Sequence, residues 1–175
     1  MRMKNIVHGL LTALLLGGIL STQGLAQVRE VTVKLDGLSC PFCAYGLEKK
    51  LKKVTGVEKV EIKVDAGITH LTLKKGKSVS VEEVEEAVKE GGFTPGDVTI
   101  AVTGHLTERD GRTVVTIPGS GELFLVEPSE QLRKIEEALK GKDKAVNLTG
   151  KLSRERLEGH VGHPYVLSIE HFSIL

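Results

Sequence analysis

The first half of this chain alternates between short runs of β-branched residues and two segments of helical spacing. Apolar positions two residues apart predict strands, and apolar positions three or four residues apart predict helices. Residues 29–103 are therefore predicted to form strand, helix, strand, strand, helix and strand, with strands at 30–35, 57–64, 68–73 and 97–103. Two helices on one face of a four-stranded antiparallel sheet make a ferredoxin-like βαββαβ sandwich, which is an α+β fold.

The two predicted helices carry distinct start signals. The first follows a loop that holds Cys40, and its apolar stripe begins at Ala44 and continues at positions 47, 51 and 54. Cys43 lies on the same stripe, so we expect it to be more buried than Cys40. The second helix opens with a capping box, Ser80 and Glu83.

The second half follows a different pattern, with five strand-like segments and one helix. Strands are expected at 98–106, 113–117, 122–126, 145–152 and 165–174, and a helix at 129–140 lies between the third and the fourth. This order resembles the OB-fold, a small five-stranded barrel. The predicted units are 28–103 and 98–175, and both claim the same junction strand. We expect one continuous strand that bends near Gly104.

The first 26 residues have the pattern of a cleavable signal peptide. Arg2 and Lys4 form a basic end, residues 9–20 an apolar run, and Gly24-Leu25-Ala26 a small-residue cleavage site. The leader indicates a periplasmic or secreted protein, and an uncleaved membrane anchor is the alternative. Because the leader holds two of the 24 basic residues and none of the 23 acidic ones, its removal changes the net charge from +1 to −1.

A near-neutral chain has no general attraction for nucleic acid. Residues 98–175 hold ten basic and eleven acidic groups, so the predicted barrel lacks the basic groove of a nucleic-acid binder. No nucleophile–base pair, phosphate loop or carboxylate pair indicates catalysis, and we expect a protein that is not an enzyme. The aromatic content is 3%, so aliphatic residues must build the cores.

The only two cysteines, Cys40 and Cys43, lie at the start of the first helix. A helix N-terminus stabilises thiolates through its free N–H groups and its dipole. Two thiols at this spacing are able to bind one soft ion or to form a disulfide with each other. Their surroundings, Gly37-Leu38-Ser39-Cys40-Pro41-Phe42-Cys43, resemble the Gly-Met-[Thr/Ser]-Cys-x-x-Cys motif of the heavy-metal-associated (HMA) domain family, with Leu38 in place of Met.

This resemblance also includes Thr55-Gly56-Val57 and Gly92-Phe93, and it covers residues 29–103. It implies that Cys40 and Cys43 are metal ligands in a near-linear two-sulfur site. Such a site suits Cu(I) or Hg(II) better than Zn(II), which prefers four ligands. The implied partners are the metal ion and either a membrane metal transporter or another metal-binding domain. In transfer, Cys40 is expected to exchange first while Cys43 anchors the ion.

Two other interpretations of the cysteines remain open. Cys40-Pro41-Phe42-Cys43 resembles the active-site sequence of thiol–disulfide enzymes, although the predicted strand order differs from theirs. In an exported protein the pair is also able to form a purely structural disulfide.

Other charged and imidazole groups are weaker candidates. His160 and His163 flank a glycine-containing loop segment and favour a solvated loop over a metal site. Lys49, Lys50, Lys52 and Lys53 complement the dipole of the first helix or form a docking surface for an acidic partner.

Overall fold

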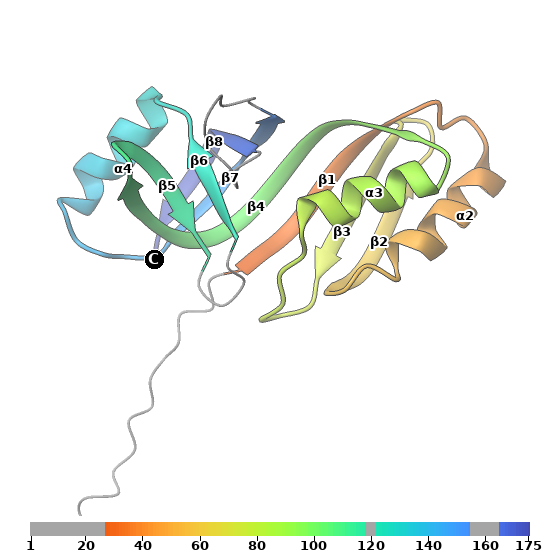
Figure 1. Cartoon of the computed structure of the whole chain (residues 1–175), viewed down its shortest axis with the longest axis horizontal. Coiled ribbons are helices and arrows are strands. Elements are labelled where there is room, and N and C mark those ends of the chain that lie inside the picture. The colour runs from red at the N-terminus through yellow and green to blue at the C-terminus, as the bar shows by residue number, and fades with distance from the viewer. Residues whose placement is uncertain (1–26, 118–121, 155–164) are drawn as a thin grey trace, which may run out of the picture.

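The computed structural model describes residues 27–117, 122–154 and 165–175 of the 175-residue chain. The predicted signal peptide and the segment with His160 and His163 lie outside these residues. Two bodies share a continuous set of strands: a sandwich of sheet and helices, and a barrel (Figure 1). Within the described ranges, no helix is both long and apolar enough to cross a membrane.

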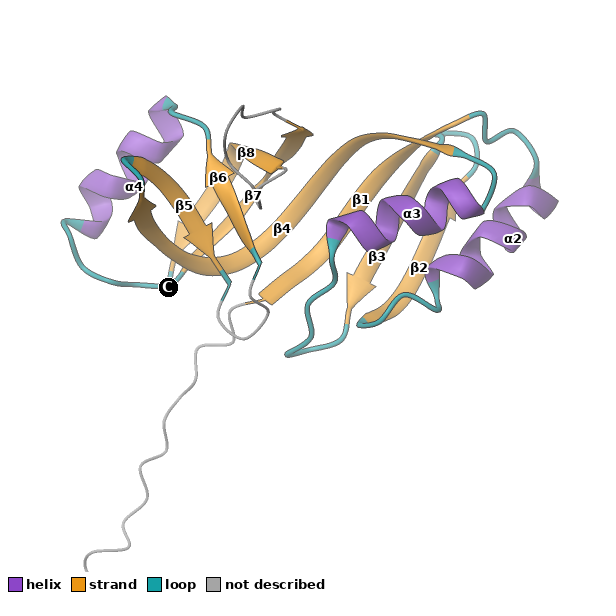
Figure 2. Cartoon of the chain, in the orientation of Figure 1, coloured by secondary structure: helices purple, strands orange, loops and turns teal. Residues whose placement is uncertain are grey.

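The sandwich has the predicted βαββαβ order. Its elements are β1 (Gln27–Asp36), α2 (Pro41–Leu51), β2 (Val57–Lys63), β3 (Ile68–Leu73), α3 (Val81–Glu90) and β4 (Thr94–Arg109). The strands pair antiparallel in the order β2-β3-β1-β4, and both helices cover the same face of the sheet (Figure 2). The observed strands agree with the predicted ones except that β1 and β4 are longer.

Apolar side chains on the helices meet those on the sheet in one core. Leu47 and Leu51 of α2 and Val84 and Val88 of α3 are completely buried, as their spacing predicted. Val33 lies opposite them on β1 and is also completely buried. Ser80 is the N-cap of α3, but its side chain makes no capping hydrogen bond, so the predicted capping box is wrong in that detail. The negative charges of Glu82 and Glu83 in the first turn instead interact favourably with the positive end of the helix dipole.

The remaining strands close a barrel around a second part of the core. Its elements are β5 (Arg112–Thr116), β6 (Leu123–Val126), α4 (Glu130–Leu139), β7 (Val146–Arg154) and β8 (Tyr165–Ile174). The strands follow the order β4-β5-β6-β8-β7, and β7 pairs back onto β4. The β6–β8 pair is parallel and the others are antiparallel. As predicted, α4 lies between the third and fourth strands of the barrel and buries Leu132, Ile135 and Leu139.

Strand β4 belongs to both bodies. Its first part, 94–103, pairs with β1, while 98–104 pairs with β7 and 105–109 with β5. Figure 1 shows this strand sweeping from the sandwich into the barrel. Gly104 lies where β4 changes partner from β1 to β5. A Cβ atom there would lie 2.6 Å from the Thr116 carbonyl oxygen, so only glycine fits without a backbone shift.

Polar contacts also connect α3 and its preceding loop with the barrel. Glu85 of α3 is buried and accepts hydrogen bonds from the Arg154 guanidinium and from Tyr165 Oη, the latter at 3.2 Å. Ser78 Oγ donates to Glu122 Oε2 at 3.1 Å. Burial raises the pKa of Glu122, and Ser78 opposes that shift. The sandwich and the barrel are therefore connected by ionic and polar side-chain contacts in addition to the strand that they share.

Substituting Gly104→Ala is expected to lower the free energy of unfolding by about 1–3 kcal/mol, because the new methyl group would overlap the Thr116 carbonyl. Gly46→Ala on α2 is the control, since a Cβ there meets nothing within 4 Å. That control is expected to stabilise the protein by about 0.5–1 kcal/mol through helix propensity. Urea unfolding measures both, and equal effects would contradict the assigned role of Gly104.

Substituting Glu85→Ala is expected to lower the free energy of unfolding by about 1–3 kcal/mol, because Tyr165 Oη and the Arg154 guanidinium lose their shared acceptor. Glu86→Ala is the matched control on the same helix, where the carboxylate is exposed and pairs with Lys89. Surface pairs of that kind contribute about 0–1 kcal/mol. A Glu85 variant as stable as the Glu86 variant would show that the contact with the barrel adds nothing.

Candidate metal centre

The loop between β1 and α2 places both cysteines at one end of the sandwich. Gly37 has a φ of +86°, which lets the chain turn as β1 ends. Leu38 follows and is 8% exposed, so its side chain packs into the core and fixes the loop. Cys40 is the N-cap of α2, Pro41 occupies the first helical position, and Cys43 lies in the first turn. This agrees with the positions predicted for the two thiols.

The exposure of the two thiols is the reverse of the prediction. Cys40 is partly buried, whereas Cys43 is exposed. Burial along α2 begins only at Ala44, so the buried stripe does not extend back to Cys43. The expectation that Cys43 would be the more buried thiol is therefore wrong.

The two thiols also differ in acidity. The Cys43 thiol donates a hydrogen bond to Cys40 Sγ, which is the largest cause of a lowered pKa at Cys40. The backbone N–H groups of Cys43 and Phe42 act in the same direction, although no regular capping hydrogen bond forms. The pKa of Cys43 is raised, first by this same hydrogen bond and then by partial desolvation and by the charge of Cys40. Cys40 is thus the more acidic thiol of the pair.

The donor set consists of these two free thiols. Within the described ranges, no group of three or more His, Cys, Asp or Glu side chains is placed to hold a metal ion. Four-ligand zinc coordination therefore has no support from neighbouring side chains, whereas two thiolates suit a soft ion with few ligands. The residues present fit Cu(I) or Hg(II).

The histidines that the structure describes have other neighbours. His70 Nδ1 lies 2.8 Å from Thr32 Oγ1 on the sheet, and His105 Nδ1 lies 2.6 Å from Asp143 Oδ1. His171 is exposed on β8. None of them joins the thiols in a metal-binding group of three.

The lysine cluster of α2 is partly neutralised. Lys50 and Lys52 form ion pairs with Glu90 and Glu48 at 3.3 and 2.5 Å. Lys49 lies over the Tyr45 ring, 4.4 Å from its centroid. The aromatic members of this helix, Phe42 and Tyr45, were not singled out from the sequence. Their position off the apolar stripe was the signal that would have identified them as exposed.

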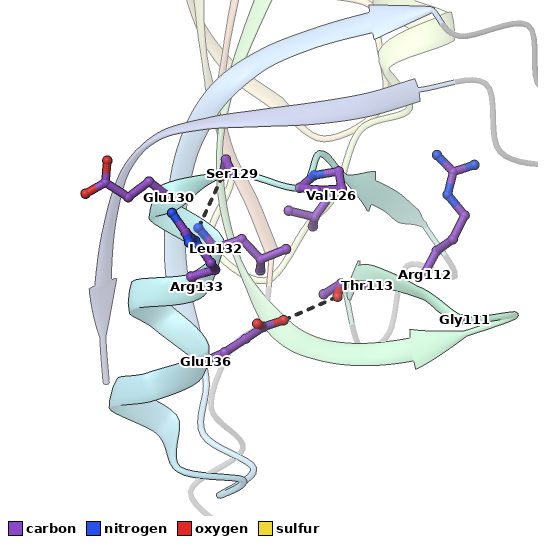
Figure 3. A pocket seen from close by; sticks show the side chains of 10 residues that line it. Gly111, Arg112, Thr113, Val126, Ser129, Glu130, Leu132, Arg133 and Glu136 are labelled. Atoms are coloured by element: carbon purple, nitrogen blue, oxygen red, sulfur yellow. Dashed lines mark hydrogen bonds between the residues drawn. The ribbon is translucent and has the colours of Figure 1, made fainter.

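A hollow of about 500 Å³ lies on the barrel, between the β4–β5 turn and α4. Val126 and Leu132 contribute apolar groups, and Thr113 Oγ1 donates to Glu136 Oε1 across it at 3.4 Å (Figure 3). Neither cysteine lines this hollow, so it is separate from the thiol site.

Curated proteins of known name match part of this chain. The copper chaperone CopZ of Staphylococcus epidermidis is 31% identical over 61 residues, which are 35% of this chain and 88% of that protein. The mercuric transport protein periplasmic component of Shewanella putrefaciens is 32% identical over 73 residues, which are 42% of this chain and 79% of that protein. No family model matches. These relatives show that the chain belongs to the heavy-metal-associated domain family.

Solved structures align with a similar share of the chain. A copper-binding domain from HMA7, a P-type ATPase, is 24% identical and covers 39% of this chain and 90% of that one, with a TM-score of 0.36. Oxidized MerP from Ralstonia metallidurans CH34 is 26% identical and covers 39% and 94%, also with a TM-score of 0.36. More than half of the chain has no counterpart in either alignment.

At neutral pH, Cys40 is expected to react with iodoacetamide faster than the more exposed Cys43, because its lowered pKa gives it the larger thiolate fraction. Peptide mapping across a pH series measures both rates. Cys43→Ala removes the hydrogen-bond donor and is expected to raise the pKa of Cys40. Cys43→Ser retains an O–H donor and is the matched control. Identical Cys40 profiles in both variants would contradict the role given to the hydrogen bond.

Proposed function

We propose that this protein is an exported carrier of a soft metal ion, Cu(I) or Hg(II), which it binds with Cys40 and Cys43. The observation that carries the proposal is the pair of free thiols at the N-terminus of α2, with no third ligand beside them among the described residues. The names of the two curated relatives, a copper chaperone and a mercuric transport protein, support the same class of cargo.

The exposure and the acidity of the two thiols support a proposed order of ligand exchange. Cys40 has the lower pKa and is the more buried thiol, so in this proposal it holds the ion throughout. Cys43 must lose its proton to become the second ligand. Because it is exposed, it is also the ligand that an acceptor thiolate replaces first. This reverses the order expected from the sequence, in which Cys40 was to exchange first.

The acceptor is proposed to be a membrane metal transporter or another metal-binding domain. Sulfur-for-sulfur exchange needs an acceptor with its own thiolates, and the exposed first turn of α2 lets such a group approach Cys43. The signal-peptide pattern of residues 1–26 supports export to the periplasm or secretion. No enzymatic reaction is proposed.

The barrel is proposed to be an OB-fold. Its strand order β4-β5-β6-β8-β7, with closure onto β4, a parallel β6–β8 pair and a helix between the third and fourth strands, supports that assignment. Its near-neutral charge and its few aromatics argue against nucleic acid as a ligand.

Thiol–disulfide exchange is the second candidate function. The lowered pKa of Cys40 and the proline between the cysteines favour it. The strand order β2-β3-β1-β4 of the sandwich disfavours it, because it differs from that of thioredoxin-like folds.

The reduced protein is expected to bind one equivalent of Cu(I) or Hg(II), and Cys40→Ser and Cys43→Ser are each expected to abolish tight binding, because one thiolate remains. Anaerobic titration read by native mass spectrometry measures this, with Zn(II) as the competing ion. Ser39→Ala, which alters an exposed neighbour that is not a ligand, is the control.

Tight binding that survives both cysteine substitutions would end the proposal for this site. Rapid disulfide reduction by the metal-free protein, lost in Cys40→Ser, would favour thiol–disulfide exchange instead.

A further inference from the structure

The six aromatic residues of the chain divide sharply by exposure. Phe124 and Tyr165 are buried in the core, and Phe93 and Phe172 are partly buried against it. The other two, Phe42 and Tyr45, are 88% and 60% exposed. Both lie within two residues of Cys43 on the same helix. A chain with so few aromatics thus places its only exposed ones beside the thiol site.

These two rings belong to one outward surface of α2. Positions 42, 45, 46 and 49 are three or four residues apart, so they share one side of the helix, which is opposite the buried Leu47 and Leu51. Gly46 lies between the rings and Lys49, and a Cβ there would meet nothing within 4 Å. No contact inside the molecule explains a helix-weakening glycine at this position. We call Phe42, Tyr45, Gly46 and Lys49, together with Lys53 just beyond the end of the helix, the α2 outer surface.

The charge of this surface is positive. Glu48 and Glu90 neutralise Lys52 and Lys50, whereas Lys49 and Lys53 make no ion pair with any residue that the structure describes. Lys53 borders a groove whose other side carries Glu83, Glu86 and Glu90 of α3, so the positive charge is confined to the α2 side. The outward side therefore presents two aromatic rings with cations at their edge. That is the composition of segments that lie in the interface of an anionic membrane.

The position of α2 suits a flat partner. Figure 1 shows α2 at the extremity of the molecule along its longest axis, with the barrel at the other extremity. The barrel therefore leaves both rings exposed. A second copy of the chain fits poorly, because its own α2 outer surface is also basic.

We propose that the α2 outer surface docks onto an anionic lipid surface, with Phe42 and Tyr45 at the level of the headgroups and Lys49 and Lys53 against their phosphates. The contact holds the Cys43 thiol close to the plane of the membrane. The contact does not depend on bound metal, so membrane docking is tested independently of the proposed metal binding.

The absence of tryptophan from the chain gives a direct test. Phe42→Trp places a single fluorophore at the most exposed ring. With vesicles of mixed phosphatidylglycerol and phosphatidylcholine, its emission is expected to shift to the blue and to be quenched by brominated lipid. Added salt is expected to reverse the shift, and pure phosphatidylcholine vesicles are expected to give little shift. Leu175→Trp, at an exposed position on the barrel, is the matched reporter and is expected not to shift.

Charge variants test the lysines separately. Lys49→Gln together with Lys53→Gln, made in the Phe42→Trp protein, is expected to weaken vesicle binding by about 30-fold. Lys142→Gln together with Lys144→Gln, two exposed lysines of the barrel, is the control and is expected to change nothing. All measurements use the metal-free, reduced full chain.

Three results would overturn the proposal. In the first, the emission of the Phe42→Trp protein shifts with neither kind of vesicle. In the second, the Phe42→Trp and Leu175→Trp proteins shift equally. In the third, the two pairs of lysine substitutions weaken vesicle binding equally. A fluorophore at position 42 that ignores vesicles but shifts with a metal-binding domain of a P-type ATPase would assign the surface to protein docking instead.

Discussion

The hydrogen bonds of strand β4 are the constraint on which the rest of this structure depends. Between Val98 and Thr103 the strand is paired on both edges, with β1 on one side and β7 on the other. Beyond Gly104 the edge that served β1 is taken over by β5. The sandwich and the barrel therefore cannot separate without breaking a ladder that belongs to both. Because β1 runs from this shared region directly to the loop with Cys40, the thiol site has a fixed direction relative to the barrel.

In this arrangement the two helices of the sandwich have different neighbours. Polar contacts with the barrel come from α3 and its preceding loop, through Glu85 and Ser78. A buried carboxylate is tolerated only where it is paired, and Arg154 and Tyr165 provide that pairing. By contrast, α2 packs its inner side on the sheet and leaves its outer side free. The helix that carries the thiols is thus the one that remains accessible.

Most of the fold was predictable because the apolar residues that have strand or helix spacing in the sequence are the ones buried in the structure. The shared strand was predictable as well, since residues 98–103 fitted the last strand of one unit and the first of the other. The pairing of Glu85 was not, because Arg154 lies 69 residues away and α3 carries several other glutamates. The exposure of Cys43 was mispredicted from its place on the apolar stripe. A stripe is buried only where another element lies opposite, and burial on α2 begins at Ala44.

That misprediction bears directly on the proposed exchange of metal ligands. Had Cys43 been buried under the helix, the exchanging ligand would have been Cys40, at the end of the loop. Cys40 instead comes two residues after the packed Leu38 and accepts a hydrogen bond from Cys43. Cys40 is therefore the more acidic thiol of the pair and Cys43 the less acidic one. The less acidic thiol is thus also the one that solvent reaches. The order of exchange proposed for the carrier, with Cys43 replaced first, rests on this difference between the two thiols.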